Sequence, residues 1–127
     1  MYGNDKSPLV IKADAFATRV IRMVKYLRYH SDSTFTPIYT QILKSGTSIS
    51  ANVGEAQYAQ SRADFITKLH IATKEANETL KWLRALLEAE VITAIQYQSM
   101  CKDADEIISI LVASLKTAKR NSQQIIK

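Results

Sequence analysis

The segment that decides the fold is FITKLHIATKEANETLKWLRALL, residues 65–87. Apolar side chains recur in it at steps of three and four residues, and they are Phe65, Leu69, Ala72, Ala76, Leu80, Leu83 and Leu87. This spacing places them on one side of an α-helix of about six turns. A stripe of that length has to be buried against other helices, so the segment predicts a helical core.

Three further helices are predicted on either side of this segment. Together, the four helices should span approximately residues 8–30, 37–59, 62–90 and 94–120. Each start carries a capping signal, and these signals are Ser7 before Pro8, Thr36 before Pro37, Ser61 with Asp64, and Thr93.

Each of these helices also carries its own inward stripe. In the first helix the stripe is Leu9, Ala13, Phe16, Val20, Val24 and Leu27. In the second it is Ile38, Ile42, Ser45, Ile49, Val53 and Ala56, and in the fourth it is Tyr97, Cys101 or Met100, Ala104, Ile108, Leu111 and Leu115. Gly46 and several hydroxyl residues are poor helix formers, so tertiary packing has to hold the second helix.

Length and composition favour one all-α domain over residues 1–127. The chain has 127 residues, 46% of them apolar, with only three Gly and two Pro. Long helices joined by short connections make neighbours antiparallel, which predicts an antiparallel up-and-down four-helix bundle. The chain lacks a stretch of roughly 20 apolar residues that could span a bilayer. Its single cysteine and its polar first residues, MYGNDKSP, favour a cytoplasmic location.

The net charge of +5 is moderate and unevenly placed, with a basic surplus in residues 1–36 and a milder one in the last segment of the chain. In the first helix the basic residues are Lys12, Arg19, Arg22, Lys25 and Arg28. We expect them to form a broad positive surface without interleaved aromatic residues, which would contact the phosphates of RNA or DNA without regard to sequence. The alternative is a solvated outer face with no ligand.

A second stripe on the third helix, well away from the core seam, contains Ile71, Glu75, Glu78 and Trp82. One interpretation places Trp82 at the flank of its own bundle. The other makes the stripe a subunit interface, because aromatic residues concentrate in such patches. Val10, Ala17 and Ile21 form a comparable stripe on the first helix, which supports a homo-oligomer.

No catalytic or metal site is predicted. Ser48, Asn52 and Glu55 share one flank of the second helix, where a structural polar network is expected, with Glu55 bonded to a basic residue of another helix or subunit. A di-iron bundle needs Glu-x-x-His pairs, but Leu27 and Thr67 precede the two histidines at that spacing. We therefore expect neither a metal nor another cofactor. An unfamiliar carboxylate site at Glu55, Glu75 and Glu78 remains as an enzymatic alternative.

Three segments resemble a known family. The segment ISANVGEA, residues 49–56, resembles the SIxANIAEG motif of the bacterial four-helix-bundle proteins named after reading frames in 23S rRNA intervening sequences. The segment DFITKLHIATKEANETLKWLRALLEAEVIT, residues 64–93, resembles the third helix of that family, and EIISILVASLKTAK its fourth. This chain has Gly-Glu-Ala at residues 54–56 where Ala-Glu-Gly is usual, which puts the end of the second helix in doubt.

The resemblance implies a bundle that assembles as a homopentameric ring. It extends to accessory proteins of diversity-generating retroelements, which are basic pentamers that bind a reverse transcriptase and nucleic acid. The family pattern marks Asn52, Glu55, Glu75, Glu78 and Trp82. We therefore expect a non-enzymatic oligomeric binding or scaffold protein whose partner is RNA, DNA or a nucleoprotein. A protein–protein adaptor without a nucleic-acid role is the alternative.

Overall fold

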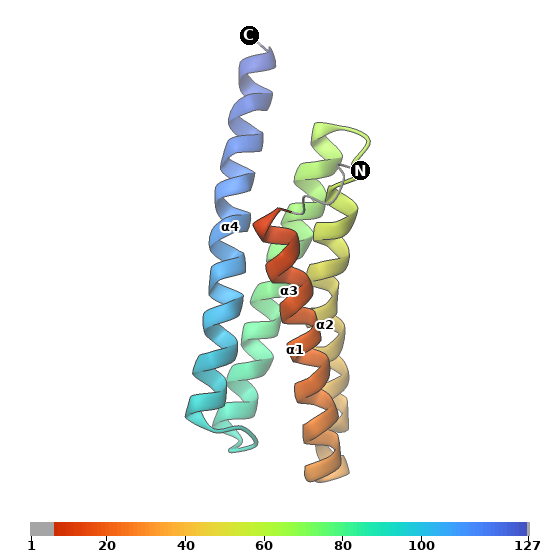
Figure 1. Ribbon diagram of the computed structural model, residues 1–127, viewed down its shortest axis with the longest axis vertical. Helices are drawn as coiled ribbons and strands as arrows, with labels where there is room; N and C mark the ends of the chain where they lie inside the picture. The colour runs from red at the N-terminus through yellow and green to blue at the C-terminus, as the bar shows by residue number, and fades with distance from the viewer. Residues whose placement is uncertain (1–6, 127) are drawn as a thin grey trace.

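The computed structural model describes residues 7–126, with side chains described up to residue 121. Within these residues the chain forms four antiparallel α-helices. The helices are α1 (Pro8–His30), α2 (Thr36–Ala56), α3 (Arg62–Glu88) and α4 (Ala94–Ile126), and a short 3-10 turn, η1 (Ser33–Phe35), precedes α2. Successive helices run in opposite directions and pack side by side (Figure 1). The up-and-down four-helix bundle predicted from the sequence is confirmed.

Side-chain caps fix the starts of three helices. Ser7 accepts a hydrogen bond from the amide of Val10, and Ser61 accepts one from the amide of Asp64. At α4, Thr93 Oγ1 accepts from the Gln96 amide at 3.1 Å, and Gln96 Oε1 accepts from the Thr93 amide at 2.8 Å. This reciprocal pair is a complete capping box.

The cap predicted for α2 is wrong. Thr36 is the first residue of the helix, and Phe35 in the cap position makes no side-chain bond to it. Asp32 caps the preceding turn η1 instead, because its carboxylate accepts hydrogen bonds from the amide and the hydroxyl of Thr34. These bonds lower the pKa of Asp32.

Three helix ends differ from the prediction. Helix α2 stops at Ala56 and α3 at Glu88, both short of the predicted ends, whereas α4 continues to Ile126 and extends beyond the turn between α2 and α3 (Figure 1). Helix α3 ends in a Schellman motif, in which Val91 N–H donates to Leu86 O at 2.9 Å and Glu90 N–H to Leu87 O at 3.0 Å. None of the helices in residues 7–126 is long and apolar enough to cross a membrane.

The buried face of each helix is close to the predicted stripe. All six residues predicted for α1 are buried. In α3, however, the buried face is rotated toward α2, so Thr79 and Leu86 are buried where Leu80 and Leu87 were predicted. The buried face of α4 also differs from the predicted stripe: Met100 and Ile107 are buried, whereas Tyr97, Cys101 and Ile108 are only partly covered. In α2, Tyr39 is buried and the predicted Ile38 is partly exposed.

This rotation follows from the contacts between helices. Helix α3 packs more extensively against α2 than against α4. At the centre of the α2–α3 contact, the hydroxyl of Thr79 lies 2.9 Å from that of Ser45, and both side chains are fully buried. The hydroxyl groups also lie near the carbonyl oxygens of their own helices, so this polar pair is satisfied inside the core.

Candidate nucleic-acid interface

Lys12 and Arg19, two of the five basic residues predicted to contact nucleic acid, bond to α4. Lys12 Nζ lies 2.9 Å from a carboxylate oxygen of Glu106. Arg19 Nη1 lies 2.5 Å from a carboxylate oxygen of Asp103, and its Nη2 donates to Ser99 Oγ at 3.0 Å. Helices α1 and α4 have the least extensive of the main interhelical contacts, and these polar bonds lie across that contact.

The other three basic residues of α1 remain exposed to solvent. We call Arg22, Lys25 and Arg28 the cationic ridge, because they lie along the exposed side of the last three turns of α1. The antiparallel register set by the Lys12–Glu106 bond places this end of α1 beside the beginning of α4. Residues 93–102 of α4 contain no acidic side chain, so that part of α4 offers the cationic ridge no carboxylate.

The surrounding sequence is equally poor in acids. Between residues 15 and 54 there are five basic side chains and one acidic side chain, Asp32, and Asp32 already accepts two hydrogen bonds from Thr34. The last turns of α1 and the first turns of α2 therefore carry more basic than acidic side chains. Such a concentration of positive charge attracts phosphate groups.

The expectation of a basic surface without aromatic residues is wrong. Tyr26 is 54% exposed and Tyr29 is 87% exposed, and both lie among the residues of the cationic ridge. The ring of Tyr26 stacks on the ring of His30 with centroids 4.0 Å apart, and the Tyr29 ring lies 5.3 Å from that of His30. The signal was present in the sequence as RMVKYLRYH, residues 22–30, where basic and aromatic residues alternate.

Open hollows lie on both sides of this part of α1. The first, of about 520 Å³, lies between α1 and the start of α4, and its lining includes Arg22, Tyr26 and the exposed Ile95. The second, of about 420 Å³, lies between α1 and α2, and its lining includes Lys25, Arg28 and Tyr29. Each hollow therefore combines a cationic group with a tyrosine.

The second stripe of α3 is partly covered by its own bundle. Trp82 packs against the hydrophobic core, and its indole Nε1 is buried without a hydrogen-bond acceptor among the described residues. Ile71 is 36% exposed, and Glu75 and Glu78 are half-buried. Of the four residues, Ile71 therefore presents the clearest apolar surface for a second chain.

The predicted polar residues of α2 have separate partners. Glu55 pairs with Lys68 of α3 at 2.9 Å, a bond across helices of the kind expected for it. The hydrogen bond and the charge of Glu55 raise the pKa of Lys68. Ser48 and Asn52 instead donate to the carbonyls of Lys44 and Ser48 in their own helix. The side chains therefore do not form one continuous network.

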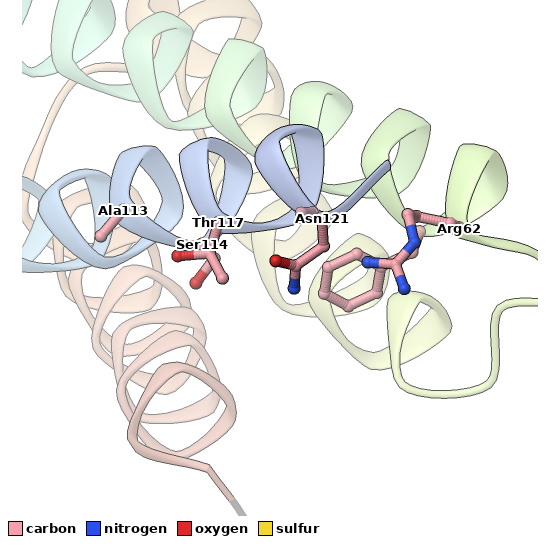
Figure 2. Close-up of a pocket in the computed structure, with 7 residues that line it drawn as sticks. Arg62, Ala113, Ser114, Thr117 and Asn121 are labelled. Carbon is pink, nitrogen blue, oxygen red and sulfur yellow. The ribbon is translucent and has the colours of Figure 1, made fainter. Parts of the chain in front are cut away.

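A further hollow lies toward the other end of the bundle, between the start of α3 and the later turns of α4. It has a volume of about 560 Å³, and Arg62, Ser114, Thr117 and Asn121 contribute its polar groups (Figure 2). Its lining contains no carboxylate, thiol or imidazole, so it offers no acid–base pair for catalysis.

Metal-binding chemistry finds no support among the described residues, which contain no group of three or more His, Cys, Asp or Glu side chains placed to hold an ion. Cys101 is partly exposed rather than a core residue, and burial of its thiol raises its pKa.

The fold defines a helical-bundle protein. The family described as 23S rRNA-intervening sequence protein matches residues 6–113, and the chain belongs to that family. The structure is similar to a crystal structure of a protein with unknown function from the S23 ribosomal protein family of Bacteroides thetaiotaomicron VPI-5482. The two have a TM-score of 0.78 and 45% sequence identity, and the match covers 85% of this chain and 98% of that chain. Among curated proteins, no sequence matches this chain. The likeness to retroelement accessory proteins stays a prediction.

Proposed function

We propose that this protein is a non-enzymatic, oligomeric binding or scaffold protein that holds RNA, DNA or a nucleoprotein through the cationic ridge of α1. The observation that carries the proposal is the uncompensated charge of Arg22, Lys25 and Arg28. Each of these side chains is exposed, and neither the second half of α1 nor residues 93–102 of α4 carries an acidic residue. Phosphate oxygens complement such a surface.

Self-association is the second part of the proposal. The exposed Ile71 and the half-buried Glu75 and Glu78 on α3 support it, and the number of five copies rests on the family resemblance alone. Light scattering should then give a mass of about 71 kDa, five times the 14.3 kDa chain. A mass of 14.3 kDa at micromolar concentration would contradict the oligomer and leave the cationic ridge unaffected.

Salt dependence tests the nucleic-acid part. Three phosphate contacts with duplex DNA predict binding about 40-fold weaker at 200 mM than at about 50 mM salt, because each contact releases about 0.9 counterion. Fluorescence anisotropy of labelled RNA and DNA measures this change. The doubly substituted variant Arg22→Glu, Lys25→Glu should bind much more weakly than the parent at both salt concentrations.

The control for this variant is Lys74→Glu, Lys81→Glu, which makes the same change of net charge at two exposed positions of α3. Arg19 is avoided, because a glutamate there would face Asp103 and disturb the α1–α4 contact. Equal loss of binding in both variants would show that only net charge matters. Parent protein without salt-dependent affinity for RNA or DNA would refute the proposal and favour the protein–protein adaptor.

A further inference from the structure

We propose that the end of α1 is a site for single-stranded nucleic acid, in which the ring of Tyr29 stacks on an unpaired base while the cationic ridge holds the flanking phosphates. This inference rests on the proposed function, since it specifies which form of nucleic acid binds beside the cationic ridge and which side chain recognises it.

The exposure of Tyr29 is the first observation in its favour. At 87%, Tyr29 is the most exposed of the large hydrophobic side chains that the structure describes, and it contributes almost nothing to the core. Its ring is therefore available to a flat partner. Aromatic side chains on a positive surface are the usual platforms for bases, because every base has a π-face.

The arrangement of neighbouring rings is the second observation. Tyr26 and His30 are nearly parallel, with an interplanar angle of 23° and centroids 4.0 Å apart, and His30 Nδ1 lies 2.8 Å from the Tyr26 carbonyl oxygen. The Tyr29 ring tilts 58° from His30. Tyr29 thus stands beside the Tyr26–His30 pair and is not stacked in it, and its side chain stays largely exposed to solvent.

The third observation is the spacing of charge and ring on one helix. Arg22, Lys25, Tyr26 and Tyr29 follow one another at steps of three, one and three residues, which places them on the same side of α1. At 1.5 Å per residue, Lys25 lies about 6 Å from Tyr29 along the helix axis, and Arg22 lies about 10 Å from Tyr29 in the same direction. A base on Tyr29 would therefore have cationic groups within two helical turns to receive its phosphates.

Single strands are favoured over duplexes for a steric reason. In a duplex each base is covered by its neighbours, and a tyrosine on a convex helix end cannot reach the face of the base. An unpaired base can turn outward and stack. The hollows beside Tyr26 and Tyr29 give a flexible strand room to follow α1 on either side.

The test compares tyrosine variants of the full-length chain by fluorescence anisotropy. The probes are labelled oligo(dT) and oligo(U) of about 12 nucleotides and a DNA duplex of the same length. Tyr29→Ala should bind both single strands roughly 5- to 150-fold more weakly than the parent, as loss of one stacked base predicts. Tyr29→Phe keeps the ring and should bind like the parent.

Tyr58→Ala is the matched control. Tyr58 is also a well exposed tyrosine, at 69%, but it lies in the turn between α2 and α3 at the opposite end of the bundle (Figure 1). Its variant should bind like the parent. A loss confined to Tyr29→Ala, larger for the single strands than for the duplex, supports the site, and a loss with only one of the two strands assigns it to DNA or to RNA.

Two outcomes separate this inference from the function on which it rests. If Tyr29→Ala binds single strands as tightly as the parent while Arg22→Glu, Lys25→Glu does not, the stacking site is refuted and the cationic ridge stands. If the parent binds none of the three probes at low salt, both the proposed function and the stacking site are refuted.

Discussion

Gly46 lies where the structure leaves no space for an added methyl group. It lies in the middle of α2, where α1 and α2 approach closely. A Cβ placed on Gly46 would lie 2.8 and 2.9 Å from the two γ-carbons of Val20 and 3.2 Å from its β-carbon. Because Val20 is fully buried and all three of its side-chain carbons are crowded, no rotation of its side chain removes the clash.

The size of the effect follows from two opposing terms. Alanine is favoured over glycine inside a helix by about 1 kcal/mol, whereas overpacking a closed core costs about 1–3 kcal/mol. The crowding at three atoms favours the upper part of that range, so Gly46→Ala should lower the free energy of unfolding by about 1–2 kcal/mol. With a urea m-value of about 2 kcal/mol per M, the midpoint should fall by about 0.5–1 M.

Gly54 provides the matched control on the same helix. A Cβ there meets nothing within 4 Å, so Gly54→Ala should gain the helix preference and raise the midpoint. On a Val20→Ala background, Gly46→Ala should also become stabilising, because the space left by the γ-carbons accepts the new methyl group. All variants are compared at one protein concentration, since self-association would shift the midpoint. A Gly46→Ala variant as stable as the parent would refute the close packing of α1 on α2.

Three other substitutions or reactions test separate parts of the fold. Ser45→Ala and Thr79→Val should show a double-mutant coupling of about 0.5–1.5 kcal/mol in urea unfolding, because each hydroxyl partners the other inside the core; additive losses would contradict the pair. Glu90 has a φ of 62°, so Glu90→Gly should raise the free energy of unfolding by about 0.5–1 kcal/mol, whereas Glu90→Ala should not. Burial raises the pKa of Cys101, so at pH 8 iodoacetamide should alkylate it more slowly in the native protein than in urea; equal rates would contradict that shift.

The sequence predicted the helices well because their main signals are local. Apolar periodicity identified all four helices and the complete inward stripe of α1, and capping residues identified the starts of α1, α3 and α4. The face of α3 was harder to place, because Thr79 is polar and Leu80 and Leu87 are apolar. Only the contact with α2, through Ser45, makes Thr79 a buried residue. Periodicity located the helix but could not fix its rotation.

Two features of the candidate interface differ in how far the sequence could reveal them. The pairing of Arg19 with Asp103 joins residues 84 positions apart, so it depends on the register of α1 against α4 and has no local signal. The exposed Tyr26 and Tyr29, by contrast, stand beside Lys25 and Arg28 in the sequence and needed only helix geometry to be recognised. The exposed aromatic rings were therefore predictable from the sequence, although the predicted basic surface did not include them.

The acidic residues of α4 divide the basic residues of α1 into a group that pairs with α4 and a group that lies beside uncharged residues of α4. Asp103 and Glu106 lie beside the first part of α1, where they bond Arg19 and Lys12 and close the bundle. One turn further along α1, Arg22 lies beside Ser99 and Gln96, which carry no charge. Two arginines on the same helix, three residues apart, therefore differ because of the helix opposite them: Arg19 pairs with Asp103, whereas the residues of α4 beside Arg22 carry no carboxylate.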